Sequence, residues 1–115
     1  MSFKNKYTLR QRVNEVNNIL LKYKDKIPII CEKDSRVQGF DIDKKKYLVS
    51  KNILFGQFIK IIRQRLKINE YTSLFLIVNN EYIPSNTSDI GFIYNLYKDM
   101  DGYLYIKYSF ENTFG

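Results

Sequence analysis

Few residues of this 115-residue chain have the types and spacing that catalysis requires. The chain has no histidine, so the commonest general acid–base group and a frequent metal ligand are both missing. Its one cysteine, Cys31, lies in an apolar run and is expected to be a core residue rather than a nucleophile. Asp41 and Asp43 stand in a basic, loop-like stretch, and the five glycines are scattered rather than gathered in a phosphate-binding loop. We therefore expect no enzyme activity, no metal site and no cofactor.

The remaining chemical feature is the final pair, Phe114 and Gly115. A glycine carboxylate has no neighbouring Cβ, so it is open to nucleophilic attack and fits a narrow channel. Activation of this carboxylate and its transfer to an amine is the chemistry that the pair would suit, with Phe114 as a recognition handle. Taken alone, however, the pair is better explained as an ordinary chain end, so the preceding residues must decide.

Charge is distributed unevenly along the chain. The net charge is +7, but residues 1–66 carry 16 basic and 6 acidic residues, whereas residues 67–115 carry 3 basic and 6 acidic residues. A strongly positive surface suits acidic peptides, anionic lipid or nucleic acid, and charge alone does not choose among them. No nucleic-acid-binding motif accompanies the ten tyrosines, which fall largely at expected strand and helix positions.

Length and composition predict one folded domain, with 44% hydrophobic and 16% aromatic residues. A single cysteine excludes an internal disulfide. No run of about 18 apolar residues predicts a membrane-spanning helix, and residues 1–6 do not resemble a signal peptide.

Periodicity and turn residues predict a helix, two strands, a helix, a strand, a helix and a strand. Thr8 and Gln11 have the pattern of a capping box at the start of the first helix. Pro28 is expected at the start of a strand or where no ladder hydrogen bond is needed. One mixed sheet with a helix across one face is the economical packing, an α+β fold in ubiquitin (β-grasp) order after the leading helix. The expected ranges are 8–23, 27–31, 46–49, 54–66 (with Asn52 as N-cap), 74–78, 90–98 and 103–108.

Several segments together resemble one family, the autophagy-related ubiquitin-like modifiers that include LC-three and GABARAP. The resemblance extends from the leading helix to the last residue, and the order and spacing of the segments make it specific. The segments are Ile27-Pro28-Ile29-Ile30-Cys31-Glu32-Lys33, Asp43-Lys44-Lys45-Lys46-Tyr47-Leu48-Val49, Gly56-Gln57-Phe58, Ile61-Ile62-Arg63-Gln64-Arg65, Asp101-Gly102-Tyr103-Leu104-Tyr105, Tyr108-Ser109 and Glu111-Asn112-Thr113-Phe114-Gly115.

The resemblance implies a ubiquitin-like core at 27–109, an N-terminal helical subdomain at 1–26 packed on the sheet, and a flexible conjugation tail at 110–115. It implies a modifier, not an enzyme, that is joined through Gly115 to phosphatidylethanolamine and acts in autophagosome formation. Two covalently attached acyl chains anchor a protein stably, whereas one is marginal. Most relatives carry residues beyond this glycine that a cysteine protease removes, so either Gly115 is the encoded terminus or the sequence was cut at this glycine.

The resemblance also implies a groove that reads short motifs in which two residues separate an aromatic from an aliphatic residue. The motif would add as a strand to the exposed edge at 46–49, with its two side chains in two pockets. Plain core packing is an alternative for Ile53, Phe58 and Ile61, and it is strongest for Phe58. The aromatic pocket would comprise Glu15, Ile19, Pro28, Lys46, Leu48 and Tyr103, and the aliphatic pocket Tyr47, Val49, Ile53, Phe58 and Ile61.

Basic side chains would attract the acidic residues that flank such motifs, namely Lys26, Lys44, Lys45, Lys46 and Arg65. The alternative is a solvated basic face. Lys26 stands where relatives usually have Arg, Ser50 replaces a common Pro, and Tyr103 replaces a common Phe.

The expected partners are activating and conjugating enzymes, a deconjugating cysteine protease and motif-bearing cargo receptors. The expected state is a cytoplasmic monomer that joins the autophagosome, or another organelle membrane, once lipidated. A non-covalent peptide-binding trafficking adaptor is the alternative function, and a role in maintaining another organelle membrane is a further one.

Overall fold

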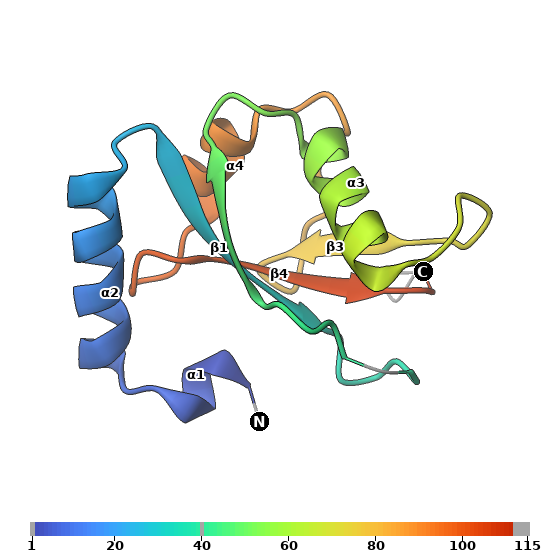
Figure 1. Cartoon of the computed structure of the whole chain (residues 1–115), viewed down its shortest axis with the longest axis horizontal. Coiled ribbons are helices and arrows are strands. Elements are labelled where there is room, and N and C mark those ends of the chain that lie inside the picture. Colours follow the sequence, from blue (N-terminus) through green and yellow to red (C-terminus); the bar gives the residue numbers. More distant parts are fainter. Residues whose placement is uncertain (1, 40, 112–115) are drawn as a thin grey trace.

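A computed structural model describes residues 2–39 and 41–111 of the chain. Four strands form one mixed sheet in the order β2-β1-β4-β3, and helices cover both of its faces (Figure 1). This is the expected α+β, β-grasp arrangement, with one short helix added in front. The elements are α1 (Phe3–Lys6), α2 (Leu9–Lys22), β1 (Lys26–Lys33), β2 (Lys46–Ser50), α3 (Phe55–Leu66), β3 (Phe75–Val78), α4 (Ile90–Tyr97) and β4 (Leu104–Ser109).

The central pair of strands joins the two ends of the ubiquitin-like core. β1 pairs in parallel with β4, from Ile29 opposite Leu104, and antiparallel with β2 on its other side. Pro28 faces Leu48 in the β1–β2 register and precedes the first β1–β4 pair. The amide of Cys31 donates to the β2 side of the strand. Successive backbone nitrogens point to opposite sides, so the nitrogen of Pro28, three residues earlier, points away from β2, at a position before the β4 pairing begins. The missing donor of Pro28 therefore costs no ladder bond, as expected.

The larger core lies between the sheet and the helices α3 and α4. Strand residues alternate, so Ile29 and Cys31 of β1 and Ile106 of β4 face this side. Phe55, Phe58, Ile62 and Leu66 form the buried stripe of α3.

A smaller aromatic core lies on the opposite face, beneath α1 and α2 (Figure 1). Phe3, Val16, Ile30 and Tyr103 are its buried members, with Tyr105 packed against them. The ring of Phe3 meets the ring of Tyr103 edge-on at 5.2 Å between centroids. The N-terminal helices are therefore part of the folded unit, packed on the sheet.

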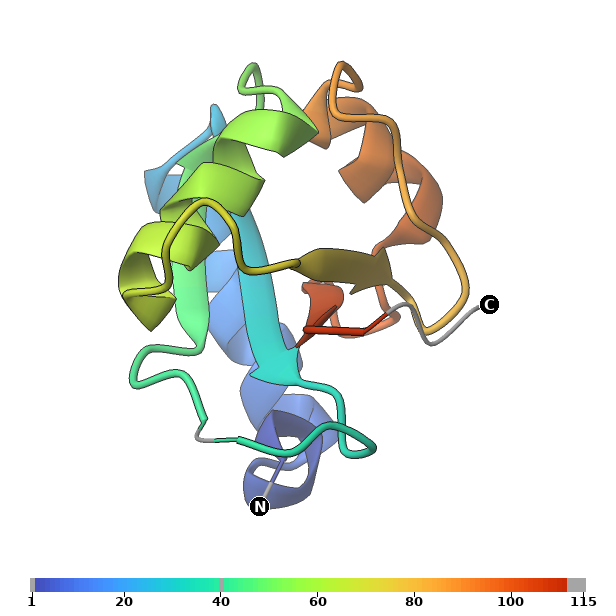
Figure 2. The same cartoon turned by 90° about the vertical axis from the view of Figure 1, so that its right-hand side faces the viewer.

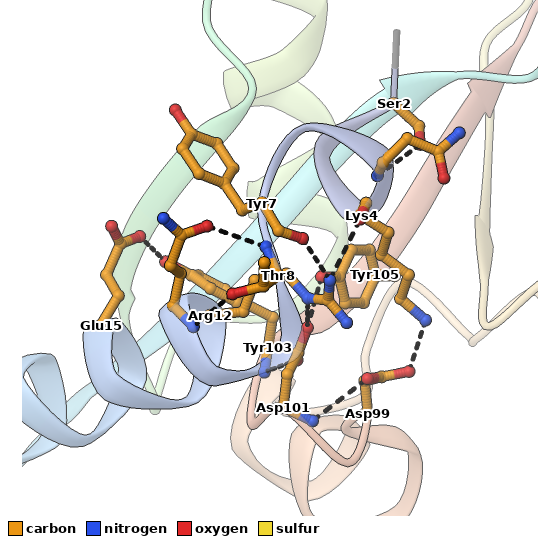
Figure 3. Close-up of polar contacts among 12 residues, drawn as sticks. Ser2, Lys4, Tyr7, Thr8, Arg12, Glu15, Asp99, Asp101, Tyr103 and Tyr105 are labelled. Carbon is orange, nitrogen blue, oxygen red and sulfur yellow. Dashed lines mark hydrogen bonds and ion pairs between the residues drawn. The ribbon is translucent and has the colours of Figure 1, made fainter.

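An ion pair and its hydrogen bonds fasten these helices to the turn before β4. Nε of Arg12 donates to Oδ2 of Asp101 at 2.8 Å, and its guanidinium also donates to the carbonyls of Lys4 and Tyr7 (Figure 3). Tyr105 donates its hydroxyl to the same Asp101 oxygen at 2.6 Å. A second ion pair joins Lys4 to Asp99.

The starts of the two long helices can be compared with their predictions. The capping box of α2 is confirmed, because Gln11 N donates to the Thr8 hydroxyl and Thr8 N donates to the Gln11 amide oxygen. The prediction of Asn52 as the N-cap of α3 is wrong, since Leu54 holds that position. The side chain of Gln57 accepts from Leu54 N at 2.8 Å, so a residue inside the helix supplies the bond that a polar cap would provide.

The residue after β4 is tied to the core. Phe110, expected to begin the tail, is partly buried, and its ring meets the ring of Tyr108 at 5.9 Å. Phe114 and Gly115 lie outside the described residues.

Candidate functional site

The edge strand β2 is the centre of the candidate site. Among residues 2–39 and 41–111 it pairs with β1 on one side only, so its other side lies at the edge of the described sheet. Its side chains alternate, as in any strand with one buried face: Lys46 and Leu48 are exposed, whereas Tyr47 and Val49 are buried. A strand added to this edge would therefore meet Lys46 and Leu48 on one face of the sheet and Tyr47 and Val49 on the other.

A first hollow opens on the α2 side of β2, with a volume of about 140 Å³. It brings together Ile19 of α2, Pro28 of β1, and Tyr103 before β4, which are far apart in sequence. Lys46 and Leu48 close it along β2, so five of the six residues predicted for the aromatic pocket line one cavity. The other lining residues are Lys44 and Tyr47.

Glu15, the sixth residue predicted for this pocket, lies beside it and bridges α2 to β2. Its carboxylate pairs with Lys46 Nζ at 2.8 Å. It also accepts a hydrogen bond from the Tyr103 hydroxyl (Figure 3). Burial by itself would raise the pKa of Glu15, but the hydrogen bonds from Lys46 and Tyr103 outweigh burial and lower it. Burial raises the pKa of Tyr103, and so does its bond to Glu15, so Tyr103 acts as a donor here.

A second hollow of about 400 Å³ opens on the α3 side of β2. Tyr47, Val49 and Ile61 line it, as predicted for the aliphatic pocket. Phe58 does not line it, because its side chain is fully buried and meets Tyr47 edge-on, with ring centroids 5.7 Å apart. Ile53 also lies outside this lining and packs against the main core. The remaining lining residues are Lys44, Leu48, Gln64 and Arg65.

Basic side chains surround both hollows. Lys44 lines both, with its ammonium 5.2 Å from the Tyr47 ring centroid. Arg65 lines the second and pairs with Asp43 at 2.8 Å. Lys26 is exposed at the other end of the β1–β2 pair and lines neither hollow.

A larger basic hollow, of about 530 Å³, continues from this site toward α1. Sequence reasoning missed the contribution of Phe3, Lys6 and Tyr7, because the first expected element began at residue 8. The alternation of aromatic and basic residues in this segment was the signal that could have predicted its part in the hollow. The three α1-side residues are joined there by Lys44, Lys45 and Lys46.

Two findings concern the reactive and metal-binding side chains of the described residues. Cys31 is fully buried, and burial raises the pKa of its thiol above the ordinary value, which disfavours the reactive thiolate. Within residues 2–39 and 41–111, no group of three or more acidic, cysteine or histidine side chains is placed to hold a metal ion. Over the same residues, no helix is both long and apolar enough to cross a bilayer.

Comparison with known families matches residues 11–115 to the family described as autophagy protein Atg8, ubiquitin-like. The chain belongs to this family. The resemblance inferred from the sequence is confirmed, and so is the ubiquitin-like α+β fold.

Individual Atg8 proteins are similar over nearly their whole length. Autophagy-related protein 8 of Mycosarcoma maydis is 44% identical over 114 residues, which cover 99% of this chain and 96% of the relative. Autophagy-related protein 8B of Oryza sativa subsp. indica is 46% identical over 114 residues, or 99% of this chain and 95% of the relative. Autophagy-related protein 8 of Emericella nidulans is 43% identical over 113 residues, or 98% and 95%. The chain is an autophagy-related, ubiquitin-like protein.

Proposed function

We propose that this Atg8-family chain is a modifier, not an enzyme, that binds short peptide motifs along β2 and is conjugated through Gly115 to phosphatidylethanolamine. The carrying observation is that two hollows flank one free strand edge on opposite faces of the sheet. Family membership supports the conjugation.

The two-hollow geometry suits a peptide in which two residues separate the anchors. In an extended strand, successive side chains alternate between faces, so residues i and i+3 point in opposite directions. They are about 10 Å apart along the strand at 3.3 Å per residue. A peptide added to β2 would place its aromatic anchor on the α2 side and its aliphatic anchor on the α3 side, while its backbone pairs with β2.

The lysines around the hollows support a preference for acidic flanking residues. Lys44, Lys45 and Lys46 follow one another at the start of β2 and line the larger basic hollow. Exposed ion pairs each contribute only about 0–1 kcal/mol, so these charges would tune association rate and selectivity more than affinity. Acidic residues preceding the aromatic anchor would meet this cluster.

Conjugation requires three acyl transfers at the carboxylate of Gly115. ATP converts the carboxylate to an acyl-adenylate with release of pyrophosphate, and a cysteine thiolate of an activating enzyme displaces AMP. The thioester passes to a conjugating enzyme, and the amine of phosphatidylethanolamine finally displaces the thiol to form an amide. Hydrolysis of that amide by a cysteine protease would return the free chain from the autophagosome or another organelle membrane.

A reconstituted conjugation reaction tests the proposed chemistry. The chain is mixed with activating and conjugating enzymes of the Atg8 system, ATP and phosphatidylethanolamine vesicles, and its intact mass is measured. We expect one added phosphatidylethanolamine, less one water, on the chain, and loss or strong slowing of this product in Gly115→Ala. No adduct, with enzymes that lipidate another Atg8 protein, would contradict conjugation.

Peptide binding is tested separately, because the groove is independent of the tail. A peptide with an aromatic-x-x-aliphatic core and acidic residues before it is titrated against the chain. We expect saturable binding that is abolished when the two anchors are replaced by alanine. Binding without lipidation would leave the non-covalent trafficking adaptor as the function.

A further inference from the structure

The helix α4 has an apolar outer face that stays exposed in the described structure. Its eight residues, Ile90-Gly91-Phe92-Ile93-Tyr94-Asn95-Leu96-Tyr97, contain no charged side chain. A helix that is apolar all round is normally buried. Yet Phe92 and Leu96 are 63% and 60% exposed, and Met100, just after the helix, is 83% exposed.

The inner face of α4 packs against the main core. Ile90 and Ile93 are buried there, and Tyr97 stacks on Tyr82 with ring centroids 4.8 Å apart. Phe92 and Leu96 are four residues apart, so they lie together on the other side of the helix. Figure 2 shows α4 at the outer margin of the molecule, where no other helix or strand of the described residues lies outside it and the segment between β3 and α4 passes beside it.

The size of this face decides among possible occupants. A helix of eight residues is only about 12 Å long. A stable dimer buries about 800 Å² on each partner, which a face of three side chains does not supply. None of the hollows along β2 or toward α1 is lined by α4. A bilayer surface, in contrast, needs neither a groove nor a large area once a covalent anchor holds the protein there.

We propose that Phe92, Leu96 and Met100 insert into the interfacial layer of the bilayer and orient the lipidated chain on it. This inference rests on the proposed membrane conjugation. Since α4 has no charge, apolar burial drives the contact, and it is insensitive to salt and requires no anionic lipid. The chain would then face the membrane with α4.

The test replaces enzymatic lipidation by a chemical tether, so failure of conjugation does not affect it. The Gly115→Cys variant is coupled to vesicles that contain a maleimide lipid and phosphatidylcholine brominated on its acyl chains. A chain retaining Gly115 is the coupling control, because Cys31 is fully buried. The chain contains no tryptophan, so Phe92→Trp introduces a single indole reporter on the outer face of α4.

A matched reporter is placed elsewhere. Tyr71→Trp lies in the loop between α3 and β3, where Tyr71 is 88% exposed. We expect emission from position 92 to be quenched by the brominated chains and shifted to shorter wavelengths, at low and high salt alike, while position 71 is unaffected. Adding Leu96→Gln should reduce the quenching at position 92.

Two results would overturn the proposal. One is equal quenching, or none, at positions 92 and 71 in the tethered protein. The other is quenching that requires anionic lipid and disappears at high salt. Circular dichroism of each variant verifies that the fold is retained.

Discussion

Arg12 of α2 and Asp101 before β4 form an ion pair that is almost removed from solvent, with side chains 10% and 0% exposed. Asp101 also accepts hydrogen bonds from Tyr103 N and the Tyr105 hydroxyl. This single carboxylate thus links α2 and the last strand of the ubiquitin-like core (Figure 3).

We expect Arg12→Ala to destabilise the chain by about 3 kcal/mol, because it leaves the buried Asp101 carboxylate without its cation. Urea denaturation followed by circular dichroism measures the change. Arg10→Ala is the control, since Arg10 is an exposed neighbour on the same helix. Equal losses for the two variants would show that the pair has no special stabilising role.

Gly102 gives a second prediction about the attachment of α2. Its φ is +93°, and a Cβ added there would lie 2.5 Å from Cγ1 of Val16. Gly102→Ala should destabilise the chain by about 1–3 kcal/mol from backbone strain, with the clash adding to it. Adding Val16→Ala should relieve the clash in Gly102→Ala, so a double-mutant cycle should show strong positive coupling. Additive losses in thermal denaturation would contradict the contact.

Ile61 and Phe58 are predicted to separate peptide binding from stability. Ile61→Ala removes part of the wall of the second hollow, so we expect about tenfold weaker binding of the aromatic-x-x-aliphatic peptide, equivalent to 1.4 kcal/mol. Phe58→Ala creates a cavity in the core and should cost about 3–5 kcal/mol of stability. Calorimetric titration and urea denaturation of both variants measure these effects. Weak binding by Phe58→Ala with normal stability would restore its predicted place in the pocket.

The acid limb of the stability profile should depend on Asp34. Hydrogen bonds from the Arg36 side chain lower the pKa of Asp34 from 3.8 to about 2, although burial opposes them. The folded state therefore holds the ionised carboxylate more strongly than the unfolded state does. This stabilisation is present above about pH 4 and is lost as the pH falls toward 2.

Asp34→Asn should consequently flatten the fall in stability between about pH 4 and pH 2. The midpoint of urea unfolding, measured across this range, gives the comparison with the unmodified chain. Asp25→Asn is the control, because the Asp25 side chain is largely exposed. An unchanged acid limb in Asp34→Asn would exclude the ion pair as its source.

The order of the elements was predictable because α2 and α3 show helical periodicity and the strands are short apolar runs between turn residues. The error at Asn52 has a physical basis: Leu54 has no capping side chain, and Gln57 bonds back to its amide instead. Sequence patterns do not reveal that a glutamine inside the helix takes over the capping bond when a polar residue such as Asn52 stands nearby as the more obvious N-cap.

The lining of the two hollows was predictable where strand alternation and the family resemblance agreed, as at Lys46 and Leu48 of β2, whereas Ile61 lies on α3 and was predicted from the resemblance. Phe58 marks the limit, because a residue on the inner stripe of a helix can line a pocket or fill a core. The role of Phe3 was missed because its burial depends on Tyr103 and Tyr105, a hundred residues later in the chain.

The position of β4 between β1 and β3 constrains how the protein can be made. Neither partner strand can complete its backbone hydrogen bonds until residues 104–109 have been synthesised and have left the ribosome. Until then β1 has only β2 as a neighbour in the sheet and β3 lacks its partner strand, so apolar strand edges stay open, a state that is prone to aggregation. The sheet therefore closes only after β4 has been synthesised, because β4 joins β1 to β3.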